Sequence, residues 1–144
     1  MKKSILEITT AITLLTGFVL SPLNANTLPS KHTKPFLIQG KLPHLSKQVK
    51  MMWEDSDFAL TKVQKKRLLV IRKDTMSQLN ILKKKINILE TEIVQASNDK
   101  LKPQKIKEKV YKLSQLKAKA TMIHLKCIYK TRNSLTQAQL NMIK

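Results

Sequence analysis

The side chains best suited to chemistry are His124 and Cys127, which stand three residues apart. On a helix this spacing places an imidazole and a thiol on one face, and both are ligands that Zn²⁺ accepts. A structural zinc site needs four ligands, and His44, Met51 and Met122 are only distant extras. We therefore predict no metal site and no cofactor. His124 and Cys127 are the candidate ligands for the alternative in which a metal ion binds. In the other alternative, His124 is a polar residue at the edge of the core and Cys127 is a small buried hydrophobic residue.

Catalysis is not predicted either. Cys127 beside His124 has the composition of a nucleophile and base, but two groups on one helix lack an oxyanion hole. The sequence has no paired carboxylates at a useful spacing, and Gly40 is the only glycine outside the N-terminal apolar run, so a glycine-rich phosphate loop is missing. These features exclude the common enzyme classes and favour a binding protein.

The charge of the chain is strongly basic, with 28 Lys and Arg against 9 Asp and Glu and a formal net charge of +19. Such a balance favours polyanions, anionic membrane surfaces or acidic protein segments as partners. Nucleic acid is not the predicted partner, because the few aromatic residues are not interleaved with the basic runs as base stacking requires. The alternative for any single lysine is that it is only a solvated residue on the exposed face of a helix.

The N-terminus has the pattern of a secretory signal peptide. Lys2 and Lys3 precede an apolar run over residues 8–20, which is followed by Pro22 and the small residue Ala25. We predict a signal peptide over 1–25, export to the periplasm, and no stable membrane insertion after cleavage, since the run is short for a bilayer span. A buried N-terminal helix is the alternative.

The remainder predicts an all-α fold with a flexible segment over 26–42 and a helical domain over 43–144. Pro43 is suited to opening a short helix. Apolar residues spaced three and four apart predict a long helix from Lys62 to about Ala96 and a second from Pro103 to about Asn133. Two helices of similar length joined by a short turn predict an antiparallel hairpin. Because a two-helix layer has little core, short flanking helices or a second protomer must cover the remaining apolar stripe.

Two copies of the pattern L-T-x-x-Q mark helix starts. In each copy the threonine hydroxyl accepts from the backbone three residues on, and the glutamine side chain reaches back, which is a capping box. The hairpin would bring both copies to the same end, so we assign them a structural role. The motif residues are Leu60, Thr61, Gln64, Leu135, Thr136 and Gln139.

These features together resemble the LTxxQ family of periplasmic stress proteins, of which Spy and CpxP are the best-known members. The resemblance rests on the signal peptide, the Met-rich segment before the first motif, the paired motifs and the basic helices between them, and it covers about residues 45–144. It implies a cradle-shaped antiparallel homodimer that holds unfolded client proteins without ATP on a basic surface with apolar patches. The chain stops soon after the second motif, so activities that depend on a longer C-terminal tail are not expected.

The resemblance and the mixture of lysine with apolar residues suggest a client-binding set. The candidates are Met51, Met52, Trp53, Arg67, Arg72, Lys73, Lys83, Lys84, Lys85, Lys112 and Lys119. Core or dimer packing is the alternative for the first three. Two other functions stay open: an adaptor that regulates the periplasmic domain of a sensor kinase, and a metal-binding member similar to ZraP or CnrX. The His and Met four residues apart in the metal-sensing branch are absent, since Ile128 follows His124 at that distance.

Overall fold

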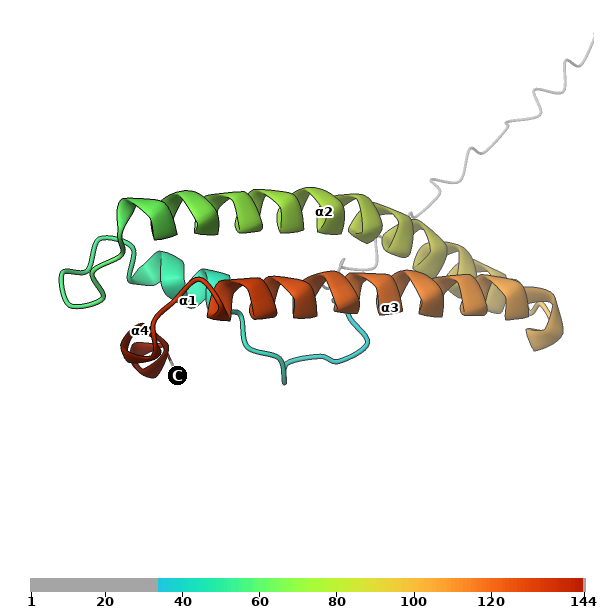
Figure 1. Ribbon diagram of the computed structural model, residues 1–144. Helices are drawn as coiled ribbons and strands as arrows, with labels where there is room; N and C mark the ends of the chain where they lie inside the picture. Colours follow the sequence, from blue (N-terminus) through green and yellow to red (C-terminus); the bar gives the residue numbers. More distant parts are fainter. Residues whose placement is uncertain (1–33, 144) are drawn as a thin grey trace, which may run out of the picture. The chain divides into compact units, whose positions relative to one another are not determined.

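The computed structural model describes residues 34–143, which fold into four α-helices (Figure 1). The helices are α1 (Leu45–Met51), α2 (Lys62–Asn98), α3 (Pro103–Arg132) and α4 (Gln137–Met142). The all-α prediction is confirmed, and these residues contain no strand. The predicted signal peptide and the first part of the predicted lead-in fall outside the described residues.

Both predicted capping boxes are formed. The hydroxyl of Thr61 accepts from the Gln64 backbone N–H at 3.1 Å, while Gln64 Oε1 accepts from the Thr61 N–H at 3.0 Å. Thr136 and Gln139 repeat this exchange at the start of α4, at 3.2 and 2.9 Å. Each box satisfies backbone donors that a helix start leaves without an intrahelical partner.

The end of α2 lies two residues beyond the predicted position. Polar residues at 97–99 predict a break, but the helix runs through Asn98 before Lys100 turns the chain with φ of 57°. The Leu101 N–H donates to the carbonyl of Ala96 at 3.0 Å, which is the long bond of a Schellman motif. The turn is therefore closed by backbone bonding, and Pro103 begins α3 as its sequence position predicts.

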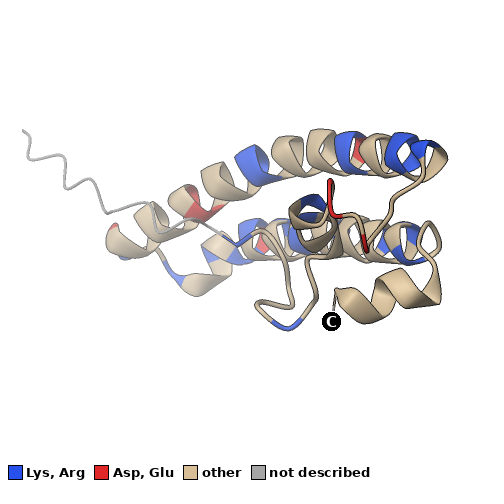
Figure 2. Cartoon of the chain, turned by 90° about the vertical axis from the view of Figure 1, so that its left-hand side faces the viewer, with Lys and Arg blue, Asp and Glu red and all other residues tan. Residues whose placement is uncertain are grey.

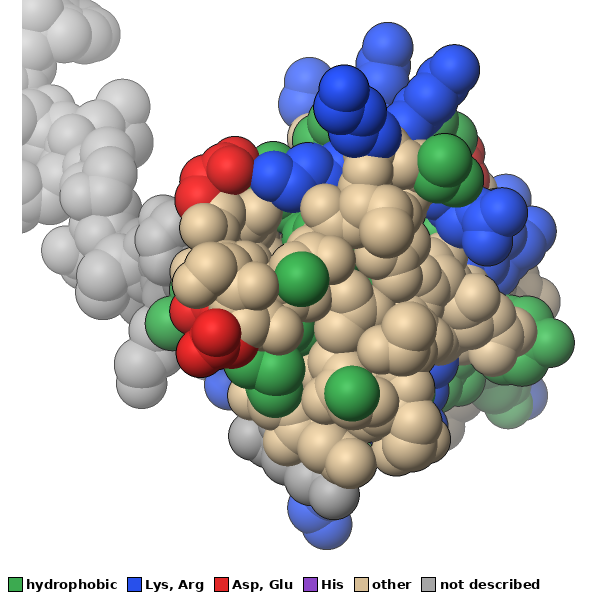
Figure 3. All heavy atoms as spheres, turned by 60° about the vertical axis from the view of Figure 1, so that its left-hand side comes forward, with side chains coloured by type: hydrophobic (Ala, Val, Ile, Leu, Met, Phe, Trp, Pro, Cys, Tyr) green, Lys and Arg blue, Asp and Glu red, His purple; other side chains and the backbone are tan. Residues whose placement is uncertain are grey.

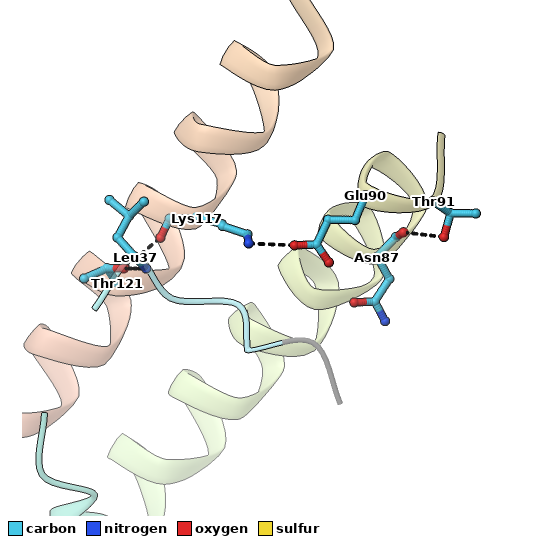
Figure 4. A network of polar contacts seen from close by, with 6 residues as sticks. All are labelled: Leu37, Asn87, Glu90, Thr91, Lys117 and Thr121. Atoms are coloured by element: carbon cyan, nitrogen blue, oxygen red, sulfur yellow. Dashed lines mark hydrogen bonds and ion pairs between the residues drawn. The ribbon is translucent and has the colours of Figure 1, made fainter. Parts of the chain in front are cut away.

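Helices α2 and α3 lie side by side, and the residues in contact run in opposite order along the two helices. Glu92 pairs with Lys109 at 2.7 Å near the turn, and Glu90 pairs with Lys117 at 2.6 Å one step further away. Figure 4 shows the Lys117 ammonium pointing at the Glu90 carboxylate across the gap between the helices. At the far end, Gln64 Nε2 donates to the Ser134 carbonyl at 3.0 Å.

The core is divided into two clusters along these helices. The larger one, at the motif end, is closed by the short helices and is formed by Leu45, Val49, Phe58, Leu68, Ile128 and Ile143. The smaller one lies nearer the turn between α2 and α3 and consists of Leu82, Ile86 and Ala120, with Phe36 packed against it. Short flanking helices thus cover apolar surface at one end only.

Residues 34–44 form no helix and precede α1. The Leu37 backbone N–H donates to Thr121 Oγ1 at 2.9 Å, so this segment is attached to α3. None of the described helices is both long and apolar enough to cross a membrane.

Candidate functional site

A row of exposed β-branched residues follows α2 beside the buried stripe that faces α3. Val63 and Val70 are 70% and 61% exposed, and Ile81 and Ile88 are exposed to a similar degree. Neighbours in this row are seven or eleven residues apart, which returns the chain to nearly the same side of an α-helix. The row therefore lies on one side of α2 and leaves apolar surface in contact with solvent.

The first hollow on this side has a volume of about 590 Å³ and lies between the first half of α2 and the last part of α3. Its apolar walls are Val63, Val70 and Tyr129, and Lys66 and Lys130 stand beside them. Arg67 completes the basic rim. Apolar walls with cationic edges suit an amphipathic segment that carries acidic groups.

A second hollow continues on the same side of α2 toward the turn. It has a volume of about 380 Å³ and includes Lys85, Ile88 and Lys112. Lys112 belongs to a row of lysines on α3 that recur every seven residues, at Lys105, Lys112, Lys119 and Lys126. We name the apolar row of α2, the two hollows and this lysine row the basic–apolar face.

The cations of this face have few carboxylate partners. The ion pairs among residues 34–143 are Lys65 with Glu54, Lys109 with Glu92 and Lys117 with Glu90, and the lysine row of α3 takes part in none of them. Figure 2 shows Lys and Arg along both long helices, and acidic residues in the loop before α2. Figure 3 shows basic side chains gathered beside apolar ones at the top of the view, with one acidic group against a basic side chain and another further down. Glu92 also lines the second hollow but pairs with Lys109, so the lysine row of α3 is left without an ion-pair partner.

Other predicted residues lie on the opposite side of α2. Arg72 follows Val70 by two residues and is therefore about 200° away around the helix. Arg72 and Trp53 line a separate hollow of about 250 Å³ between α1 and α2. Lys83 is related to Lys85 in the same way and is half-buried.

The three residues of the Met-rich segment differ from one another in exposure. Met51 is exposed, whereas Met52 and Trp53 are half-buried and pack against the larger core cluster. Lys65 extends over the Trp53 ring at 5.7 Å from its centroid and pairs with Glu54 at 2.9 Å. Met52 and Trp53 thus contribute to packing, as the alternative allowed, and Met51 is free to contact another molecule.

The predicted client-binding set is therefore not one surface. Arg67, Lys85 and Lys112 line the hollows of the basic–apolar face. Lys73, Lys84 and Lys119 are exposed. The remaining five lie on or beside α1 or on the α1 side of α2, and client binding stays a prediction for all eleven.

Sequence reasoning missed Val63, Val70, Lys66 and Lys130 as site residues. In the sequence these residues stand outside the buried seam of α2, which gives the stronger periodic pattern. The available signal was the spacing of Val63, Val70, Ile81 and Ile88, since β-branched residues that repeat outside the buried stripe mark a second face of the helix.

His124 is buried, with 7% of its surface exposed, and is stacked between two rings. The Phe36 ring centroid lies 4.8 Å away and that of His44 lies 4.9 Å away, with interplanar angles of 26° and 23°. Burial and, to a lesser degree, the nearby His44 lower the pKa of His124 below its ordinary value. Stacked imidazoles hold their nitrogens in separate planes, so His44 and His124 do not converge on one ion.

Cys127 is buried. Within residues 34–143, no three His, Cys, Asp or Glu side chains lie together in a way that could hold a metal ion. The described geometry therefore gives no support to a metal centre at His124 and Cys127. In comparisons with known proteins, no family model, curated protein or solved structure matches the chain.

Proposed function

We propose that this chain is an exported, ATP-independent holdase of the Spy and CpxP type, which binds unfolded envelope proteins in the periplasm. The observation that carries the proposal is the basic–apolar face, where Val63 and Val70 stand exposed beside Lys66 and Arg67. A folded protein that keeps such residues in water has a use for them, because large exposed apolar patches mark interaction sites.

The two components of the face have different roles in this proposal. Cations without carboxylate partners attract acidic segments over a screening length of about 10 Å at 0.1 M salt. The apolar row then provides short-range contact that does not depend on a particular client sequence. No nucleotide is required, since binding and release follow from the affinity of the client for the face.

We also propose a homodimer, formed through a stripe of α3 that meets the basic–apolar face at Tyr129. Tyr111, Met122 and Tyr129 are exposed on a second stripe of that helix, which also contains Ala118 and the half-buried Leu125. A second copy that covers this stripe would contact the first hollow at Tyr129 and would leave the apolar row of α2 and the lysine row of α3 accessible. A cradle-shaped arrangement of the two copies is the form that the family resemblance suggests.

The direct test is suppression of aggregation. The purified chain, without nucleotide, is added at near-stoichiometric ratio to a reduced or heated client, and light scattering is followed. We expect suppression that weakens as salt is raised from 0.1 to about 1 M, where the screening length is about 3 Å. Failure to suppress aggregation at low salt would refute the holdase.

A matched pair of variants assigns the activity to the face. Val70→Asp places a carboxylate within the first hollow, and Val94→Asp makes the same change at an exposed site on α2 that does not line it. We expect Val70→Asp to reduce suppression several-fold and Val94→Asp to leave it unchanged. Equal effects would separate holdase activity from this face, whereas binding to a sensor kinase without suppression would favour the adaptor.

A further inference from the structure

Residues 34–44 lie across α3 as a strap that is attached at three contacts. The Leu37 N–H donates to Thr121 Oγ1 at 2.9 Å, and Figure 4 shows this bond where the strap meets the helix. The Phe36 ring stacks on the His124 imidazole with 4.8 Å between the ring centroids. His44 stacks on the same imidazole with 4.9 Å between the centroids. Two of the three contacts thus involve one side chain of α3.

The surroundings of the His124 imidazole favour its neutral form. It is buried, and its Nδ1 has no hydrogen-bond partner. A proton added at Nδ1 would lie at a buried atom where no acceptor compensates it. Burial, followed by the nearby His44, accordingly lowers the pKa of His124.

The charged groups around this ring add no compensating carboxylate. From α2, the antiparallel register that pairs Glu90 with Lys117 places Lys83 level with His124, because Lys83 lies seven residues before Glu90 and His124 lies seven residues after Lys117. The strap contributes His44, with Lys34 and Lys41 exposed along it. Helix α1 contributes the exposed Lys47, and α3 itself contributes Lys126 and Lys117, the latter already paired with Glu90. Every unpaired member of this group is a lysine or a histidine, and none is a carboxylate.

We propose that the strap is an acid-released cover: protonation of His124 detaches residues 34–44 from α3 and uncovers the apolar surface beneath Phe36. Phe36 packs against the cluster of Leu82, Ile86 and Ala120, so its departure exposes apolar side chains close to Lys83. The released form has additional apolar surface beside a cation, on the side of α2 opposite the basic–apolar face. This inference does not depend on the holdase proposal.

The direction of the effect follows from proton linkage. With the strap attached, His124 stays neutral at pH values where a hydrated imidazole, with an ordinary pKa of about 6.5, already binds a proton. The released state therefore binds more protons, and acid favours it. One linked proton changes the ratio of released to attached strap by up to about tenfold per pH unit below about 6.5, until the attached form also becomes protonated.

Hydrogen exchange at the Leu37 amide measures this release, since that N–H is bonded only while the strap is attached. Exchange is followed by NMR between pH 7.5 and 5 and is expressed as a protection factor relative to the unstructured rate at each pH. We expect the Leu37 protection factor to fall by up to about tenfold per pH unit below about 6.5. The Ile86 amide, in the middle of α2, serves as the internal reference and should keep its protection.

His124→Phe preserves an aromatic ring that stacks on Phe36 but cannot take up a proton. In this variant the Leu37 protection factor should not depend on pH, and the wild-type His124 ring should titrate over the same pH range in which Leu37 loses protection. If the variant does not fold, the test rests on the wild-type protein, in which the pH range of the loss of Leu37 protection is compared with that of the His124 titration. Constant protection in the wild type, loss at a pH where His124 does not titrate, or equal loss in His124→Phe would overturn the proposal.

Discussion

Gln64 and Gln139, one from each copy of the repeated motif, hydrogen-bond to each other through their side-chain amides. Gln64 Nε2 donates to Gln139 Oε1 at 2.8 Å, and Gln139 Nε2 also donates to the carbonyl of Phe58 at 2.8 Å. Phe58 is fully buried in the larger core cluster. The two helix starts are thus joined to each other and to the loop before α2.

Replacing Gln139 with leucine should destabilise this junction. The substitution leaves the Phe58 carbonyl without its donor, and an unsatisfied buried polar group costs about 1–3 kcal/mol. We expect a loss of this size in the free energy of unfolding, measured by denaturant titration. Gln137→Leu changes an exposed residue of the same helix and is the matched control; equal losses in the two variants would show that the junction adds little.

The first capping box gives a second prediction. Thr61→Ala removes the hydroxyl that accepts from the Gln64 N–H, and losing such a cap costs about 1 kcal/mol. Thermal and denaturant midpoints should both fall. Thr91→Ala, within α2, removes an exposed hydroxyl that bonds only to the carbonyl of Asn87 and should leave the midpoints nearly unchanged. Unaltered midpoints in Thr61→Ala would mean that the cap is not formed in solution.

Two isoleucines of α2 belong to different surfaces, Ile86 to the core and Ile88 to the basic–apolar face. Ile86 has 0% of its surface exposed, whereas Ile88 has 60% exposed. Ile86→Ala should lower the free energy of unfolding by about 2–5 kcal/mol, because it opens a cavity in the smaller cluster. Ile88→Ala should change it by no more than about 0.5 kcal/mol. Reversal of this order would show that α2 presents a different side to α3.

The proposed dimer gives a fourth prediction. Met122→Glu places a charge within the second stripe of α3, where a partner copy would have to bury it. Size-exclusion chromatography with light scattering should show a dimer for the wild type and a monomer for Met122→Glu. Met76→Glu makes the same change at an exposed position of α2 and should remain dimeric. A monomeric wild type at micromolar concentration would refute the dimer itself.

Much of the local structure was predictable from short-range patterns. Thr61 and Thr136 mark their helix starts because a capping box involves residues only three apart. Pro103 likewise marks the start of α3, since its fixed φ suits the first helical turn. The end of α2 was less predictable, because the bonding around Lys100 depends on backbone carbonyls and not on side-chain identity.

The candidate site was only partly predictable. Arg67, Lys85 and Lys112 were identified from charge, but charge alone does not separate them from Arg72 and Lys83, which lie on the α1 side of α2. Which side of a helix faces a hollow depends on where the short helices pack. That position is set by contacts between residues distant in the sequence.

The sequence by itself determined the helices, their caps and the basic character of the chain, since these depend on residue type and on neighbours within one or two turns. Only the tertiary structure decided that Gln64 meets Gln139, that Val63 and Val70 remain exposed, and that His124 is enclosed by Phe36 and His44. The physical reason is that burial depends on which surfaces meet, and residues 75 or more positions apart meet only when the whole chain has folded.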